Sequence, residues 1–269
     1  MLECVVNVAE GRTREVVLEL ARAAGEALLD VHRDADHNRS VLTLAGPRVE
    51  EATWALARRV AELVDVRGHE GVHPWLGALD VVPFVPLEGS SFEEAIGARD
   101  RCAVQLADEL AIPVFLYGPE RSLPYVRRHA FDDLAPDRGP SRPHPRLGAS
   151  CVGARGVLVA YNVVVAAPLA QAREVARRLR SPNVRTLAFQ AGARVQVSAN
   201  LIDPVAVGPA TFVDLVRQQV DVVGCELVGL VPAWVLEATP PERWRELDLG
   251  PDRTIEERLS HGYALDRVP

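Results

Sequence analysis

The chain has 269 residues and no lysine, so its 30 basic residues are all arginine. This absence excludes any mechanism in which a lysine amine forms a Schiff base with its substrate. No block of like charges is present, and the net charge is −7. A chain with neither a basic patch nor a basic total charge is not expected to bind nucleic acid.

Paired cysteines and long apolar runs are missing too. The cysteines at 4, 102, 151 and 225 form no C-x-x-C pair, which excludes a zinc knuckle or a thioredoxin-like motif. No apolar run reaches the roughly 18 residues of a membrane helix, and the first residues lack the pattern of a signal peptide. We therefore expect a soluble, cytoplasmic protein with no membrane partner.

Hydrophobic periodicity predicts the same order of elements twice. In the first half we expect strands at 2–8, 28–31, 40–45 and 79–85, with helices at 13–28 and 47–63, followed by a helix at 92–110 and a strand at 114–117. In the second half we expect strands at 157–165, 184–190, 195–201 and 226–231, with helices at 168–179 and 209–223. Each half thus has the β-α-β-β-α-β order of a ferredoxin-like unit.

The predicted fold class is α+β, an α/β sandwich of two ferredoxin-like subdomains packed side by side with a cleft between them. The expected subdomains are 1–150, including a Pro- and Arg-rich connecting excursion at 119–149, and 151–238. A charged tail follows at 239–269, with a short helix near 255–259. Clefts between domains are favoured sites for small molecules.

The segment from His69 to His73 matches the H-E-x-x-H pattern of zinc proteases. That pattern binds zinc only on a helix, which places both imidazoles on one face. Gly68 and Gly71 each weaken a helix by roughly 1 kcal/mol relative to Ala, and Pro74 disfavours helical backbone at His73. Zinc hydrolysis is therefore a minor alternative, and we expect no metal.

A histidine on a rigid turn before a strand is suited to proton transfer, although it can also be a loop residue without a role.

Further polar residues interrupt the apolar strands of the first half. Asn7 and Glu10 end the first strand, where they could also cap the next helix. His37, Asn38 and Arg39 lie between the second and third strands, where they could also form a solvated hairpin turn. Asp80 lies at the start of the fourth strand.

The second half has its own polar cluster, which comprises Arg155, Asn162 and one side of the strand at 195–201. Gln196, Ser198 and Asn200 alternate along that strand, so they share one face. A polar strand face either lines a ligand site or faces solvent. Amides in place of charges favour the ligand site.

These segments together resemble the formiminotransferase domain family of glutamate formimidoyltransferases. The resemblance covers roughly residues 2–237 and rests on Glu3–Arg12, Asp36–Val41, His69–Pro74 with Gly77–Pro86, Gly153–Arg155 with Ala160–Asn162, Gln196–Leu201 and Glu226–Pro232. It implies a pair of ferredoxin-like subdomains. It also implies that a formimino group moves from formiminoglutamate to N5 of tetrahydrofolate, a co-substrate, and that the family's frequent homodimer is one expected state.

The resemblance assigns roles to the polar residues. The family's general acid/base is the histidine before the loop proline, which is His73 here. Arg39 and Arg155 are candidates for the substrate carboxylates, since a guanidinium binds them bidentately. Gln196 and Asn200 could orient the folate or the amidine. The remaining candidates for substrate or folate binding are Asn7, Glu10, His37, Asn38, His69, Trp75, Asp80 and Asn162.

Two positions depart from the family pattern. Ala9 stands where the family has a serine, and Trp75 stands where the family has an arginine after His-Pro. The indole of Trp75 could instead stack on a pterin ring. These departures motivate an alternative function, a folate- or ligand-binding homologue that has lost or changed the transfer activity.

Overall fold

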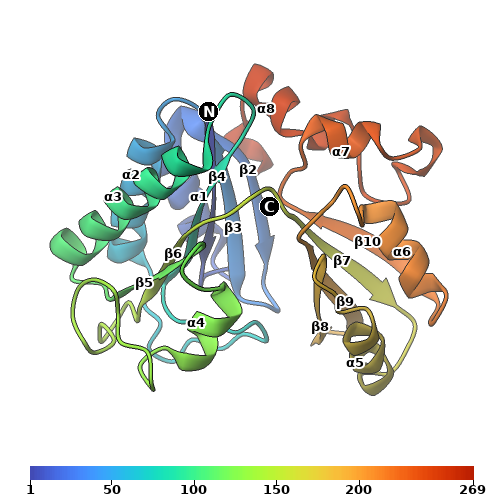
Figure 1. Ribbon diagram of the computed structural model, residues 1–269, viewed down its shortest axis with the longest axis horizontal. Coiled ribbons are helices and arrows are strands. Elements are labelled where there is room, and N and C mark those ends of the chain that lie inside the picture. The colour runs from blue at the N-terminus through green and yellow to red at the C-terminus, as the bar shows by residue number, and fades with distance from the viewer. The chain divides into compact units, whose positions relative to one another are not determined.

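The computed structural model describes residues 1–269, which form two compact units. The first unit contains Met1–Gly156 together with the C-terminal segment Gly262–Pro269. The second unit contains Val157–His261. Each unit has its own β-sheet and its own helices (Figure 1), which confirms the predicted α+β class.

The sheet of the first unit has six strands in the order β2-β3-β1-β4-β6-β5. They are β1 (Leu2–Val8), β2 (Leu28–Asp34), β3 (Arg39–Ala45), β4 (Leu79–Pro86), β5 (Val114–Tyr117) and β6 (Ser150–Ala154). Strands β1 to β4 pair antiparallel, whereas β6 pairs parallel with both β4 and β5. The predicted β-α-β-β-α-β order thus forms most of this sheet, and β5 and β6 extend it.

Three helices cover one face of this sheet: α1 (Arg14–Ala24), α2 (Val49–Leu63) and α3 (Phe92–Leu110) (Figure 1). A short 3-10 turn, η1 (Gly25–Ala27), follows α1. Cys4, Val6 and Val8 alternate along β1 and belong to the core under these helices. Asn7 lies between them in sequence and therefore on the opposite face.

A second, smaller core lies on the opposite face. Phe115 and Cys151 belong to it, whereas their strand neighbours Val114 and Val152 belong to the first core. Helix α4 (Leu123–His129) packs there through Val126. The segment at 119–149, expected to be a connecting excursion, therefore contains a helix that covers this part of the sheet.

The sheet of the second unit has four antiparallel strands in the order β10-β7-β9-β8. The strands are β7 (Val159–Val165), β8 (Val184–Ala191), β9 (Arg194–Leu201) and β10 (Val222–Val228). Helices α5 (Leu169–Arg178) and α6 (Pro209–Arg217) share one core with alternate strand residues such as Val163 and Val197. The remaining short elements are α7 (Ala233–Glu237), η2 (Pro241–Arg243), η3 (Pro251–Arg253), α8 (Ile255–His261) and η4 (Leu265–Arg267).

Several boundaries differ from the sequence-based expectations. The units divide after Gly156 rather than after residue 150, because β6 is buried along its whole length in the first sheet. The last strand, expected at 226–231, is β10 at Val222–Val228, and Gly229 follows it with a φ of 84°. The tail expected at 239–269 is divided, since its last eight residues, Gly262–Pro269, belong to the first unit.

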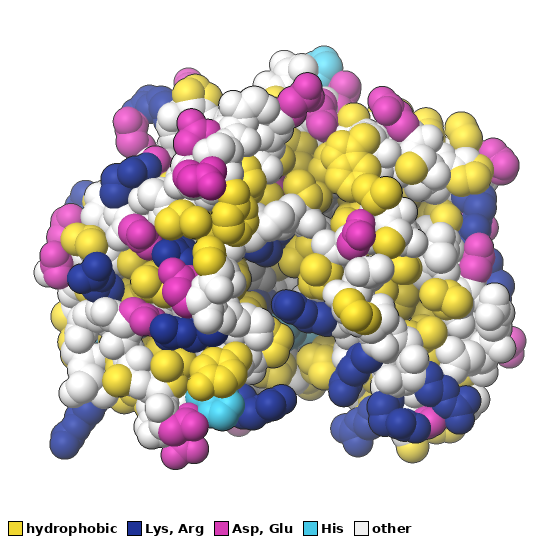
Figure 2. Space-filling model, in the orientation of Figure 1, with side chains coloured by type: hydrophobic (Ala, Val, Ile, Leu, Met, Phe, Trp, Pro, Cys, Tyr) yellow, Lys and Arg dark blue, Asp and Glu magenta, His cyan; other side chains and the backbone are white.

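The surface carries its positive charge on arginine alone. Figure 2 shows arginine side chains gathered over α5 of the second unit, where Arg177 and Arg178 both pair with Glu174. Cations in the last turn of a helix are stabilised by the helix dipole. None of the helices combines the length and the hydrophobicity that crossing a bilayer requires.

Candidate functional site

Asp80 is the centre of a charged cluster in the first unit. Its side chain is fully buried, and its Oδ2 accepts hydrogen bonds from Nη1 of Arg39 and Nη2 of Arg127, each at 2.6 Å. Its Oδ1 accepts a hydrogen bond from the backbone N–H of Leu76 at 2.9 Å. One carboxylate thus joins β3, α4 and the loop that leads into β4.

Arg39 also binds Asn7 on the neighbouring strand. Its Nε and Nη2 donate to Oδ1 of Asn7 at 3.2 and 2.7 Å. Asn7 in turn donates to the carbonyl of Val5 at 2.8 Å. The guanidinium expected to bind a substrate carboxylate is therefore engaged by Asp80 and Asn7, and its side chain is only 12% exposed.

Two arginines keep the buried carboxylate of Asp80 ionised. Burial alone would raise the pKa of Asp80, but the charges and hydrogen bonds of Arg39 and Arg127 outweigh it, so this pKa lies below its usual value. The cluster holds one negative and two positive charges, and it is therefore a cationic environment for its neighbours.

His73 lies beside this cluster on the loop before β4. Its Nδ1 is 2.7 Å from the carbonyl oxygen of Pro74, to which Nη1 of Arg127 also donates at 3.0 Å. A carbonyl oxygen can only accept, so Nδ1 carries the proton and Nε2 of the neutral ring keeps its lone pair. Burial lowers the pKa of His73 to about 3, and the charges of Arg39 and Arg127 act in the same direction.

His37 forms a second imidazole site close to the first. Its Nδ1 lies 3.0 Å from Oδ2 of Asp34, and both side chains are largely buried. The rings of His37 and His73 are 6.3 Å apart between centroids, with an angle of 63° between their planes. The sequence suggested a solvated turn or a binding residue at His37, and the structure places its ring next to His73.

Asn38 connects three loops of the first unit. Its Oδ1 accepts from the backbone N–H of Gly11 at 3.0 Å, and its Nδ2 donates to the carbonyl of Glu70 at 3.0 Å. These contacts fix the orientation of the amide. The same Nδ2 lies 3.2 Å from Nδ1 of His69, so this ring nitrogen accepts and the proton of the neutral ring is on Nε2.

Gly71 allows the histidine loop to lie against the turn that carries His37. A Cβ added at Gly71 would lie 2.3 Å from the carbonyl oxygen of His37, a distance that side chains do not tolerate. The backbone N–H of Val72 also donates to the carbonyl of Asp36 at 3.4 Å. Backbone packing therefore sets the distance between the two imidazoles.

Trp75 and Glu10 have structural contacts in the first unit. Trp75 packs against the main core, and its ring meets that of His69 edge-on, with centroids 4.9 Å apart. Glu10 accepts from the backbone N–H groups of Arg12 and Thr13 at 2.7 and 2.8 Å, just before α1. These contacts agree with the helix-capping role that the sequence suggested for Glu10.

Arg155 follows β6 at the end of the first unit. Its Nη1 donates to the carbonyl of Gly156 at 2.9 Å, and no carboxylate pairs with it. The guanidinium is half-buried and retains donors for an anionic ligand. The structure therefore distinguishes the two arginines that the sequence treated alike.

A separate polar face lies on the sheet of the second unit. In the strand register Gln196, Ser198 and Asn200 lie opposite Val164, Asn162 and Ala160, so the predicted polar residues of β7 and β9 share one face. Nε2 of Gln196 donates to Oγ of Ser198 at 3.2 Å, and Nδ2 of Asn162 donates to Glu226 at 2.9 Å. Gln196 is 1% exposed, whereas Asn200 is exposed.

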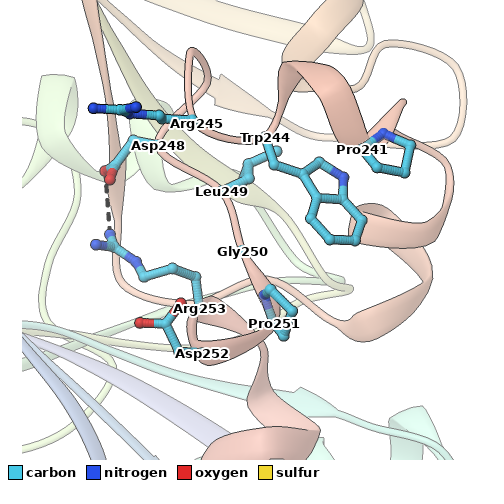
Figure 3. A pocket seen from close by; sticks show the side chains of 9 residues that line it. All are labelled: Pro241, Trp244, Arg245, Asp248, Leu249, Gly250, Pro251, Asp252 and Arg253. Carbon is cyan, nitrogen blue, oxygen red and sulfur yellow. Dashed lines mark ion pairs between the residues drawn. The ribbon is translucent and has the colours of Figure 1, made fainter.

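A pocket of about 500 Å³ in the second unit contains none of the predicted residues. Its apolar side chains come from Pro241, Trp244, Leu249 and Pro251 (Figure 3). Asp248 and Arg253 point toward each other across it and pair at 3.4 Å. This pocket contains no histidine or other side chain suited to proton transfer near neutral pH, so it is a weaker candidate than the cluster around His73.

The loop that matches the zinc-protease pattern is not helical. Residues 69–73 have no helical hydrogen bonds, so His69 and His73 do not share a helix face. No group of three or more His, Cys, Asp or Glu side chains is arranged to hold a metal ion.

Two residues of the cluster were missed in the sequence. Arg127 lies in the segment at 119–149, where Ser122 caps α4 and Pro124 follows in its first turn. That signal predicts a helix start, but not that the helix reaches Asp80. Asp34 is the last residue of β2, three positions before His37, and nothing in the sequence marked it as the partner of that histidine.

Comparison with known proteins gives the same family over most of the chain. The model of the formiminotransferase domain, N-terminal subdomain, matches residues 1–155. The glutamate formimidoyltransferase of Streptococcus pyogenes serotype M1 is 33% identical, over 88% of this chain and 90% of that protein. That of Thermoplasma acidophilum is also 33% identical, over 88% and 89%.

Longer relatives match as well. The formimidoyltransferase-cyclodeaminase of Rattus norvegicus is 34% identical over 86% of this chain. The aligned part is 50% of that protein, so the chain spans about half the length of these relatives. From its matched residues and its relatives, the chain belongs to the formiminotransferase domain family.

Proposed function

We propose that this protein transfers a formimino group from formiminoglutamate to N5 of tetrahydrofolate, with His73 as general acid/base. The names of its relatives support the class of reaction. The observation that carries the proposal is the contact between Nδ1 of His73 and the carbonyl of Pro74. It leaves Nε2 as the proton acceptor of a ring whose orientation is fixed.

The transfer requires one proton to leave N5 and one to reach the departing amine of glutamate. His73 is neutral at ordinary pH, because burial and two nearby guanidiniums hold its pKa low. A neutral imidazole can accept the N5 proton, and such proton transfer contributes about 10²–10⁴-fold in rate. A bound donor carries carboxylates, which would offset the positive charges near His73 and make it a stronger base.

An anionic donor needs a cationic side chain to bind its carboxylates. Arg155 is our candidate for a donor carboxylate, since its guanidinium is not paired with an acid. We assign Arg39, Asn7 and Asp80 to holding the loop in place rather than to direct contact. His69, Asn38 and Glu10 are assigned to the same supporting role through their contacts with neighbouring loops.

Folate contacts are proposed for the polar residues that remain. Asn162, Gln196 and Asn200 offer amide donors and acceptors on one sheet face, which suits the amide-like edge of a pterin. Trp75 is held by His69 and by the core, so we propose that it shapes the loop instead of stacking on the pterin. A cleft between the units, a cytoplasmic location and a homodimer remain predictions.

The test is a titration with tetrahydrofolate followed by formiminoglutamate, with product absorbance and glutamate release measured together. Wild-type protein should release glutamate in step with product, and His73→Ala should abolish both while unfolding at the same urea concentration. His261→Ala is the matched control, because His261 is an exposed histidine on α8. Folate binding without transfer would instead support the ligand-binding alternative, and retained activity in His73→Ala would rule out the mechanism.

A further inference from the structure

Asp34 and His37 form a buried acid–imidazole pair that the proposed reaction does not yet use. Oδ2 of Asp34 lies 3.0 Å from Nδ1 of His37, and the two side chains are 12% and 9% exposed. Oδ1 of the same carboxylate accepts the backbone N–H groups of Asp36 and His37, each at 2.8 Å. The carboxylate is therefore fixed at both oxygens.

The carboxylate of Asp34 determines that Nδ1 of His37 carries a proton. Burial alone would raise the pKa of Asp34, but the hydrogen bonds from His37 hold it well below its usual value, so Asp34 is ionised. An ionised carboxylate can only accept, so Nδ1 of His37 carries a proton. A carboxylate in this position orients an imidazole and stabilises the imidazolium that forms on it.

The two histidines differ in their surroundings although they are close together. His73 shares the Pro74 carbonyl with the cationic Arg127, and Arg39 and Arg127 both disfavour a proton on it. His37 has the anionic Asp34 at its Nδ1. Their ring centroids are 6.3 Å apart in an edge-on arrangement, so both imidazoles border the same part of the first unit.

We propose that the Asp34–His37 pair is a second catalytic group of this site, the general acid that protonates the departing glutamate nitrogen. This inference rests on the proposed formimino transfer. His73 would then accept the proton from N5, and His37 would donate the proton to glutamate, whereas otherwise His73 would perform both transfers. An imidazole with cationic neighbours is suited to act as a base, and an imidazole with a carboxylate at its Nδ1 is suited to act as an acid.

The step balances as follows. A bond forms between N5 and the formimino carbon, and the proton on N5 moves to Nε2 of His73. The bond between that carbon and the glutamate nitrogen breaks, and the nitrogen keeps the electron pair and takes a proton from Nε2 of His37, which enters the step protonated on both ring nitrogens beside the Asp34 carboxylate. His73 gains one proton and His37 loses one. A proton transfer from His73 to His37, directly or through water, therefore returns both rings to their starting states.

The test compares His37→Gln, Asp34→Asn and the control His261→Gln in the full chain. Steady-state rates and the ¹⁵N isotope effect at the departing glutamate nitrogen are measured for each variant. His37→Gln should lower kcat by about 10²-fold, since it removes one acid catalyst. The isotope effect should rise above the wild-type value, because unassisted C–N cleavage becomes rate-limiting. A purely structural role would not change it.

Asp34→Asn tests the same assignment without removing the imidazole. The asparagine keeps an oxygen for the backbone N–H groups of Asp36 and His37, but places an N–H donor opposite Nδ1 of His37. The protonated ring then loses the negative charge that stabilises it, so kcat should fall with the same rise in isotope effect. This variant also keeps the proposal testable if His37→Gln fails to fold.

The outcomes are distinct. A wild-type kcat in both variants, or a lower kcat with an unchanged isotope effect, would overturn the role of His37 while leaving transfer by His73 intact. No transfer by wild-type protein would overturn the proposed function itself, and this inference with it. His261→Gln should match wild type in both measurements, because its pair with Glu257 is exposed.

Discussion

Arg127 and Asp80 pair at 2.6 Å although 47 residues separate them in the chain. The same guanidinium donates to the carbonyl of Pro74, which is also the partner of His73. Arg127 therefore touches both the buried acid and the loop of the proposed base. The charge of this arginine and its geometry can be tested separately.

Replacement of Arg127 should separate these two effects. Arg127→Met removes a positive charge that lowers the pKa of His73, so that pKa should rise toward its ordinary value. Arg127→Lys keeps the charge, but an ammonium cannot contact both Asp80 and the Pro74 carbonyl as the planar guanidinium does. The pKa of His73 should therefore stay low while kcat falls. NMR titration of His73 and the pH profile of kcat/KM measure the two quantities. Equal pKa values in the two variants would contradict an electrostatic effect of Arg127.

Asp80→Asn should destabilise the first unit strongly. The change leaves the largely buried guanidiniums of Arg39 and Arg127 without their anion. Breaking a buried ion pair by removing one partner costs about 3–5 kcal/mol. Urea unfolding measures this loss, with Asp65→Asn as control, since Asp65 pairs with Arg67 at the surface. Equal unfolding midpoints for the two variants would mean that the buried charge contributes little.

Acid should remove the contribution of Asp80 in wild-type protein. The folded-state pKa of Asp80 is lowered, so its stabilisation is complete above the ordinary aspartate value of about 3.9 and is lost as the pH falls through the lower folded value. Asp80→Asn has no such group, so the difference in free energy of unfolding between wild type and variant should shrink in that acid range. Chemical unfolding at a series of pH values measures it, and a constant difference would contradict this linkage.

Gly71→Ala should lower activity more than stability. A Cβ there would lie 2.3 Å from the carbonyl oxygen of His37, so the loop must move and the two imidazoles must separate. We expect kcat to fall by roughly tenfold or more, because a shift of about 1 Å at a catalytic group can cost 10²-fold. Gly156→Ala is the control, because a Cβ at Gly156 would meet nothing within 4 Å. Unchanged kcat in Gly71→Ala would show that the loop adapts.

Much of the fold could be predicted from hydrophobic periodicity. The strand at Leu79–Pro86 and the helix at Phe92–Leu110 lie within one residue of their predicted ranges. The strand is a long continuous apolar run, and the helix has a clear start at its Ser91 cap. Strand β6 was missed because its five residues are all buried in a parallel arrangement, which leaves no alternation to detect. The start of β10 was taken for helix, because Val222 and Val223 continue the apolar pattern of α6.

Part of the candidate site could be predicted too, from the positions of its polar residues and not from hydrophobic periodicity. Asn7, Arg39 and Asp80 stood out as polar residues next to apolar strands, and His37 and His73 stood out as histidines in loops of the family pattern. The structure brings all five into one unit. Their partners did not stand out, since Asp34 is the last residue of β2 and Arg127 lies in α4, and a charged residue is ordinary at either kind of position. Periodicity shows which side chains are unusual, but long-range contacts decide what each one does.

The return of the C-terminal segment to the first unit makes the second unit an insertion. Val268 is buried in the first core, and its carbonyl accepts a hydrogen bond from Arg14 on α1 at 2.8 Å. The second unit is therefore joined to the first by two covalent connections, one after Gly156 and one before Gly262. A single backbone cut at either connection would leave the units joined through the other, so the two can be released from each other only by cutting twice.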